Sequence, residues 1–242
     1  MNLRLPVISG TIARRLLVNF RADPDVIRRF LPAPFRPKII NGVGLIGICL
    51  IRLERMRPKG LPAFCGFNSE NGAHRIAVEW DVAGRRCEGV FIPRRDTSSR
   101  INALVGGRVF PGVHHHSQFN VEDSGGRCRI NVIDETKADL LSVCAHESRG
   151  IEAGSIFATM HQASEFFRCG SVGYSVRRET GVFDGLELHA FQWEMRPLKI
   201  EWARSSFFFD ERRFPEGSVV YDSAFLMRGI EHEWHQLPVL GG

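Results

Sequence analysis

Lysine is scarce in this sequence of 242 residues, and the arginines that replace it are scattered. Lysine accounts for 4 of the 32 basic residues, and the arginines run from Arg4 to Arg228 with no more than two in succession. A nucleic-acid-binding surface usually shows a basic stripe with exposed aromatic residues, and no such stripe is visible. The formal net charge of +5 therefore reflects an arginine-favouring composition, and we expect no nucleic-acid partner.

Long apolar runs are also missing. No stretch approaches the ~18 apolar residues that a membrane-spanning helix needs. Arg14, Arg15 and Asp23 interrupt the region where a secretory leader would have its apolar segment. The six cysteines lie far apart without a C-x-x-C pair, which indicates reduced and mostly buried thiols. We expect a cytoplasmic protein with no membrane association.

The familiar catalytic signatures are absent as well. The sequence has no G-x-G-x-x-G, no P-loop and no G-x-S-x-G elbow, so neither a nucleotide-binding nor a hydrolase function is supported. We expect no cofactor.

Apolar and polar residues alternate with a period of two through most of the chain, between glycine-centred turns. This pattern predicts strands at about residues 14–20, 43–53, 75–82, 87–93, 112–122, 128–134, 187–195, 199–209 and 219–228. Many short strands with few helices favour an α+β, mainly antiparallel β fold, a closed or nearly closed barrel with a few flanking helices. No linker or repeat divides the chain, so we expect a single domain over residues 1–242.

Three segments have helical signals instead. The first opens at Asp23-Pro24, where aspartate can cap the helix and proline fits its first turn, and it stops before Pro32. The second covers about residues 97–105, and the third and longest covers residues 155–170 with an apolar stripe along one side.

The strand expected at 112–122 carries a polar row. Because successive side chains of a strand point to opposite faces, one face collects His114, His116, Gln118, Asn120 and Glu122. In an open sheet this row faces water, whereas in a barrel that holds a ligand it lines the cavity. A third reading is a metal site, since two imidazoles two residues apart on a strand can share one ion.

Two further clusters contain groups capable of chemistry. Residues 68–75 place Glu70 and Arg75 with amides and an imidazole just ahead of an apolar strand, which is typical either of a functional loop or of a solvated turn. Residues 232–235, His-Glu-Trp-His, lack the helical H-E-x-x-H spacing and are interpreted as a structured tail. Since neither histidine pair has a suitable third ligand, we expect no stoichiometric metal.

Several segments in fixed order resemble the YqjF-like family, domain of unknown function 2071, of the acetoacetate decarboxylase-like superfamily. The segments are residues 31–37, 68–71, 88–92, 107–112, the helix at 155 and residues 222–228 followed by 232–235. The similarity covers nearly the whole chain, and its specificity comes from the order and spacing of motifs that are individually loose. The resemblance implies an antiparallel barrel, wrapped by a few helices, around a small-molecule cavity.

The resemblance also shows what this chain lacks. The true decarboxylases hold a β-keto acid as a Schiff base on a lysine that follows a Gly-x-Pro-like turn, with a second lysine beside it; acetoacetate decarboxylase is the standard example of an amine activated in this way. Here the turn reads Phe110-Pro111-Gly112-Val113, without either lysine. The least implausible substitute, Lys137, follows two carboxylates that would protect its charged form. The resemblance also implies that Glu70, ahead of a strand, corresponds to a carboxylate residue of the family that lies near the substrate.

Two functions remain open at this point. The first is an uncharacterised small-molecule-binding β-barrel for a ligand that bears a carboxylate or a carbonyl, with ligand-binding residues Glu70, Arg75, Arg108, His114 and His116. Arg108 either pairs with a ligand carboxylate at the cavity mouth or satisfies turn carbonyls. The alternative is a lyase-like enzyme that uses Glu70, His114 or His116 for acid/base chemistry on a keto acid. The sequence also allows a homo-oligomer.

Overall fold

The computed structural model describes residues 6–105, 111–177 and 181–241. In chain order its elements are β1 (Ile8–Ala22), α1 (Pro24–Phe30), β2 (Arg36–Pro37), β3 (Ile39–Ile40), β4 (Val43–Pro58), a 3-10 turn (Ala63–Cys65), β5 (Phe67–Val82), β6 (Arg85–Thr97), α2 (Arg100–Val105), β7 (His114–Ser124), β8 (Arg127–Asp134), β9 (Asp139–Glu147), α3 (Met160–Cys169), β10 (Val172–Val176), β11 (Phe183–Ala190), β12 (Arg196–Ser205) and β13 (Val219–Leu240).

The strands join into one sheet, and nine of them close a ring. Around this nine-strand ring the order is β1, β4, β5, β6, β7, β8, β9, β12 and β13, and β13 pairs again with β1. Most pairs are antiparallel, but β6 pairs in parallel with both β7 and β10. The prediction of a mainly antiparallel β fold with few helices is confirmed.

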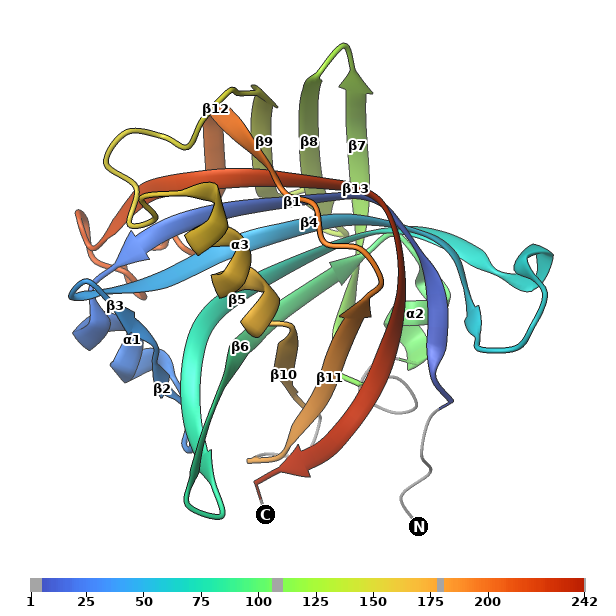
Figure 1. Ribbon diagram of the computed structural model, residues 1–242, viewed down its shortest axis with the longest axis horizontal. Coiled ribbons are helices and arrows are strands. Elements are labelled where there is room, and N and C mark those ends of the chain that lie inside the picture. The colour runs from blue at the N-terminus through green and yellow to red at the C-terminus, as the bar shows by residue number, and fades with distance from the viewer. Residues whose placement is uncertain (1–5, 106–110, 178–180, 242) are drawn as a thin grey trace.

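A second connection closes the other side of the long strands. Strand β10 pairs with β6 and with β11, and β11 pairs with the C-terminal part of β13. In Figure 1, β7, β8 and β9 stand above the long strands, whereas β10 and β11 lie below them. The strands β13, β1, β4, β5 and β6 therefore form a common wall with a different enclosure on each face.

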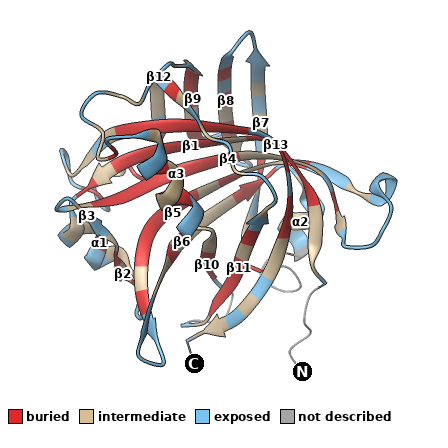
Figure 2. Ribbon diagram, in the orientation of Figure 1, coloured by how far each residue is buried: buried red, intermediate tan, exposed pale blue. Residues whose placement is uncertain are grey.

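Side-chain alternation along the common wall distributes the core between the two faces. Leu16 and Val18 of β1 belong to a large apolar cluster that also contains Ile130 and Val143 from β8 and β9, so this cluster fills the nine-strand ring. Leu17 belongs to a second cluster, with residues of α3 and β11, on the opposite face. Figure 2 shows the buried residues in red along the middle of β1, β4, β5 and β13.

The capping residues set where the helices begin. Helix α1 is capped by Asp23, whose side chain accepts a hydrogen bond from the Asp25 amide, and it begins with Pro24 as predicted. Helix α3 is shorter than the predicted 155–170, because Thr159 caps it through the Gln162 amide. Before it, Ser155 donates to Asp222 instead of continuing a helix.

Other differences from the sequence prediction concern strands, including the short β2 and β3, which were not predicted. Strands β9 and β10 lie in segments for which no strand was predicted. Residues 232–235, interpreted as a structured tail, lie inside the 22-residue strand β13.

Within the described residues, no helix is long and apolar enough to cross a lipid bilayer.

Candidate functional site

A cavity of about 300 Å³ lies on the face of the common wall that is turned away from the nine-strand ring. Its lining comes from β1, β4, β5, β6, β10, β11 and β13, with contributions from α2 and the start of β7. The barrel interior was the place expected from the resemblance, but the large apolar cluster occupies the nine-strand ring. The cavity is instead bounded by the second connection, through β10 and β11.

One transverse row of residues places several functional groups together. In register across the sheet, Leu17 pairs with Cys49, Cys49 with Ala73, Ala73 with Arg95, and Arg95 with His114. Cys49, Ala73, Arg95 and His114 all line the cavity. Since paired residues in neighbouring strands share a face, four strands bring a thiol, a guanidinium and an imidazole to one side of the wall.

A second arginine of the site, Arg75 on β5, is separated from Asn19 on β1 by a glycine of the strand between them. Its Nη2 donates to Oδ1 of Asn19, two strands away on β1, and its guanidinium carbon lies 4.8 Å from the centre of the Phe167 ring. Gly47 of β4 lies between them, and a Cβ there would be 2.5 Å from the Val18 carbonyl oxygen and 3.4 Å from Arg75 Nη2. A side chain at position 47 would therefore clash with the backbone of β1 beside the Arg75–Asn19 hydrogen bond.

The cavity lining contains four arginines, Arg15, Arg57, Arg75 and Arg95, and one carboxylate, Asp96. Asp96 is paired with Arg94, and Arg57 donates to the carbonyl oxygens of Arg55 and Leu61. Arg15, Arg75 and Arg95 form no ion pair with any described residue, and their hydrogen bonds go to neutral partners. Arg95 Nε, for example, donates to Ser175 Oγ at 2.8 Å. Nε of Arg15 and Nε of Arg75 are buried without a partner in the described structure. The lining thus carries three guanidinium groups, those of Arg15, Arg75 and Arg95, without an ion-pair partner among the described residues.

Burial acts on the titration of these groups. It lowers the pKa of Arg75 and that of Arg95 to about 10, below the ordinary arginine value. Both remain protonated at neutral pH. Burial, with the charge of Arg95 adding to it, also lowers the pKa of His114 to about 4, so this imidazole is neutral at pH 7. An anion in the cavity would offset the cost of burying the guanidinium charges.

Gly112 belongs to the turn at which the sequence resemblance would place the decarboxylase lysines. Its φ of +79° lies in the left-handed region, and a Cβ would be 2.8 Å from Ser175 Cβ and 3.2 Å from Arg95 Nε. Its carbonyl oxygen is 2.9 Å from His114 Nδ1. A lysine at this position would meet both strain and a clash, so the local backbone is built for glycine.

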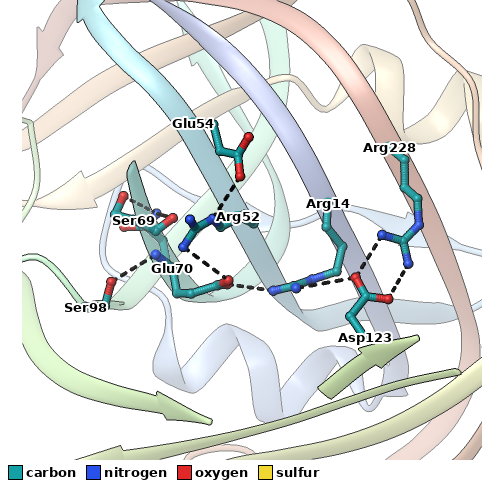
Figure 3. A network of polar contacts seen from close by, with 9 residues as sticks. Arg14, Arg52, Glu54, Ser69, Glu70, Ser98, Asp123 and Arg228 are labelled. Carbon is teal, nitrogen blue, oxygen red and sulfur yellow. Dashed lines mark hydrogen bonds and ion pairs between the residues drawn. The ribbon is translucent and has the colours of Figure 1, made fainter. Parts of the chain in front are cut away.

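Glu70 belongs to a different site. It lies on β5 with the opposite parity to Arg75 and does not appear among the described lining residues of the cavity. Oε2 of Glu70 accepts from Arg14 Nη2 at 2.6 Å, and Arg52 approaches its other oxygen at 3.7 Å. Arg14 also reaches Asp123, which is paired with Arg228 at 2.6 Å (Figure 3). Burial raises the pKa of Glu70 despite these arginines.

The predicted polar row divides in the structure. Ser117, Phe119 and Val121 face inward. The residues of the polar row alternate with them, as expected: His114, His116, Gln118, Asn120 and Glu122. His114 lines the cavity, but His116 lies outside its described lining, with Nδ1 3.1 Å from Oε1 of Glu135. The structure thus brings Arg75 and His114 together at the cavity, away from Glu70 and His116. Arg108 lies outside the described residues.

The lysines lie elsewhere. All four are described, and none lines the cavity in the part of the chain that the structure covers. Lys38 pairs with Glu88 at 2.6 Å and Lys59 with Glu233 at 2.8 Å, whereas Lys137 and Lys199 are exposed. Over the same ranges, no group of three or more histidine, cysteine, aspartate or glutamate side chains could hold a metal ion.

Sequence reasoning missed Arg15, Arg95 and Cys49 as site residues. Arg15 and Arg95 each belong to an Arg-Arg pair, at 14–15 and 94–95, and alternation predicts that the two members face opposite sides of the sheet. The sequence alone could therefore have indicated that one arginine of each pair lies on the opposite face from the other. For Arg14 the carboxylates come from Glu70 of β5 and Asp123 of β7, which no local pattern contains, whereas the partner of Arg94 is Asp96, two residues along β6.

The arrangement suits recognition of an anion. A guanidinium presents a planar fork of donors that matches a carboxylate, and a desolvated, unpaired guanidinium binds it most strongly. The neutral imidazole of His114, beside Arg95, can accept or donate a hydrogen bond at a carbonyl oxygen. The rest of the lining is largely apolar.

A family model for DUF2071, an uncharacterized conserved protein, matches residues 10–213. Among solved structures, one similar chain is an acetoacetate decarboxylase-like enzyme from Sphingomonas wittichii RW1, with 12% identity and a TM-score of 0.61, covering 96% of this chain and 93% of that one. An acetoacetate decarboxylase from Legionella pneumophila has 11% identity and a TM-score of 0.58, covering 99% and 90%.

A third similar structure is the enduracididine biosynthesis enzyme MppR complexed with pyruvate, with 12% identity and a TM-score of 0.61, covering 100% of this chain and 91% of that one. At these identities the likeness establishes the acetoacetate decarboxylase-like fold. Among curated proteins, none matches the sequence.

Proposed function

This chain belongs to the DUF2071 family of uncharacterized conserved proteins, and we propose that it binds a small organic carboxylate in the cavity, on Arg75 and Arg95. The ligand carboxylate would complete the hydrogen bonding of the two guanidinium groups. In this proposal the protein acts in the cytoplasm, where its six free cysteines stay reduced.

The observation that carries the proposal is the contrast in charge pairing. Arg75 is buried and Arg95 half-buried, yet neither has a carboxylate partner among the described residues. Transfer of an unpaired charge out of water is costly unless an opposite charge or hydrogen bonds compensate it. A cavity of about 300 Å³ beside these groups supplies room for the missing partner.

The similar structures support a carboxylate ligand by analogy. MppR was solved with pyruvate, which carries a carboxylate, and acetoacetate decarboxylases act on a β-keto acid. What transfers to this chain is the acetoacetate decarboxylase-like fold, and the proposal for its ligand rests on its own arginines.

Calorimetric titration tests the proposal with three six-carbon probes: hexanoate, hexanol and hexylamine. We expect hexanoate to bind and the neutral and cationic probes to bind at least tenfold more weakly, because a charged hydrogen bond is worth about 1.5–3 kcal/mol. Arg75→Met and Arg95→Met should each weaken hexanoate about tenfold or more. Arg129→Met, at an exposed arginine outside the described cavity lining, is the matched control. Equal binding of all three probes would refute carboxylate recognition.

An enzyme that acts on a keto acid is the second candidate, and His114 is the observation that favours it. This neutral imidazole lines the cavity in register with Arg95, where a base could remove a proton next to a carbonyl. Native mass spectrometry of the purified protein, followed by incubation of any retained ligand, separates the two functions. An unchanged ligand supports binding alone, and turnover that is lost in His114→Gln supports catalysis.

A further inference from the structure

We propose that the ligand is an anionic amphiphile, a medium-chain unbranched aliphatic carboxylate whose hydrocarbon tail points from the arginines toward an apolar mouth. This inference rests on the proposed carboxylate binding and names the class of carboxylate. It follows from how polarity is distributed along the cavity, from its volume and from its opening.

Polarity changes along the two strands that run the length of the cavity. On β5 the lining residues that share one face proceed from Arg75 through Ala73 to Phe67, so the charge lies at one end and an aromatic ring at the other. On β4 the lining runs from Cys49 through an isoleucine and a leucine to Met56, and it ends at Arg57 and Pro58. The Arg57 guanidinium is already used, because it donates to the carbonyl oxygens of Arg55 and Leu61. A ligand anchored at Arg75 therefore extends along an apolar wall.

The polar side chains between the two ends are already satisfied. Nδ2 of Asn71 donates to Ser69 Oγ at 2.9 Å and to the Ser69 carbonyl oxygen at 3.2 Å. Opposite them, β6 and β11 contribute Ile92, Leu186 and Leu188. A hydrocarbon tail would leave none of these hydrogen bonds broken, whereas a hydroxylated or charged ligand body would find few partners along this stretch.

The mouth is formed by residues that line the cavity and also meet solvent. Phe67, after the β4–β5 connection, is 47% exposed, and Ile101 of α2 is 73% exposed. Both belong to the lining. Large apolar side chains exposed together at an opening are typical of a binding site for an apolar group. The tail of a bound amphiphile would cover them.

The volume limits the length of the tail. A water molecule occupies about 30 Å³ in the liquid, so a cavity of about 300 Å³ has room for roughly ten non-hydrogen atoms. Octanoate has this number of non-hydrogen atoms, eight carbons and two oxygens. We therefore expect octanoate to fill the cavity and longer chains to leave their ends at the mouth.

Titration of butanoate, hexanoate, octanoate and dodecanoate tests the inference. Each methylene buried between butanoate and octanoate should raise affinity about fourfold, roughly two-hundredfold in total, because burial of a CH₂ is worth about 0.8 kcal/mol. From octanoate to dodecanoate the gain should be much smaller. Equal affinity for butanoate and octanoate would overturn the amphiphile and leave carboxylate binding intact. Binding of none of the four would overturn the proposed function itself.

Variants at the mouth provide a second test. Phe67→Ser and Ile101→Ser should weaken dodecanoate about tenfold and leave butanoate unchanged, because the short ligand does not reach the mouth. Phe64→Ser is the matched control, since Phe64 lies in the same connection, is 86% exposed and is not among the described lining residues. Equal losses in Phe64→Ser and Phe67→Ser, or equal losses for butanoate and dodecanoate, would contradict the assigned mouth.

Discussion

Arg14 and Arg15 are neighbours on β1 and face opposite sides of the common wall. Arg14 is buried and contacts two carboxylates, those of Glu70 and Asp123. Arg15 lines the cavity, and its described contacts are with Met227 and the ring of Trp193. His74 and Arg75 repeat the pattern on β5. His74 is fully buried on the ring side with Nε2 3.0 Å from Ser205 Oγ, whereas Arg75 lines the cavity.

The difference separates charges that hold the fold together from charges that are free to bind. On the ring side, removal of one partner leaves another charge buried and unpaired, which is costly. On the cavity side, the guanidinium groups already lack a partner, so their removal takes away a desolvation cost along with the group. Pairing, rather than burial alone, therefore distinguishes the two sets of residues.

The largest expected effect comes from the paired side. Arg14→Met leaves Glu70 with only the more distant Arg52 and Asp123 with only Arg228, and we expect the free energy of unfolding to fall by about 3 kcal/mol. Urea denaturation at pH 7 measures it. A companion variant, Arg14→Met with Glu70→Gln, should recover part of the loss because it removes one of the stranded charges. A loss below 1 kcal/mol in the single variant would show that the network is not a structural one.

The next largest effect on the free energy of unfolding is expected from acidification, through His74. Burial lowers the pKa of His74 from 6.5 in the unfolded chain to about 3. The neutral ring therefore contributes stability that is fully present above pH 6.5 and is lost as the pH falls toward 3. Between pH 6.5 and pH 4 we expect a loss of about 3 kcal/mol from this group. Urea unfolding at both pH values should show a smaller difference for His74→Gln. The same difference in both proteins would exclude His74 as the source.

A smaller effect on stability is expected on the cavity side. Arg75→Met keeps the aliphatic stem but removes the desolvated charge and one hydrogen bond to Asn19. We expect the free energy of unfolding to change by less than about 1 kcal/mol, while hexanoate binding weakens about tenfold or more, as described above. If Arg75→Met unfolded as easily as Arg14→Met, the distinction between paired and unpaired arginines would fail.

The smallest expected effect is on the lysines, because we predict that none of them forms an imine with acetoacetate. The four lysines lie outside the described cavity lining, and Lys38 and Lys59 are held by carboxylates, so no amine is set up to form an imine. Incubation with acetoacetate and borohydride should leave the intact mass unchanged and release no carbon dioxide. A covalent adduct on one lysine, together with carbon dioxide, would show that a lysine reaches the site.

Sequence periodicity predicted much of the fold because strand alternation is a local property. It gave the inward face of β7, with Ser117, Phe119 and Val121, and the start of α1. The length of α3 was wrong because the partner of Ser155, Asp222, is 67 residues away. The cavity could not be predicted to include His114 and leave out His116, which share a parity. Strand β7 pairs with β6 only at residues 114–116 and then follows β8 away from the cavity.

The common wall also sets the mechanical character of the cavity. Its ring-side face is packed against the large apolar cluster, and close-packed interiors have low compressibility. The wall cannot bend toward a small ligand or away from a bulky one without disturbing that packing. We therefore expect the site to be rigid along β1, β4 and β5, so that a ligand of the proposed class would have to fit the existing shape of the cavity.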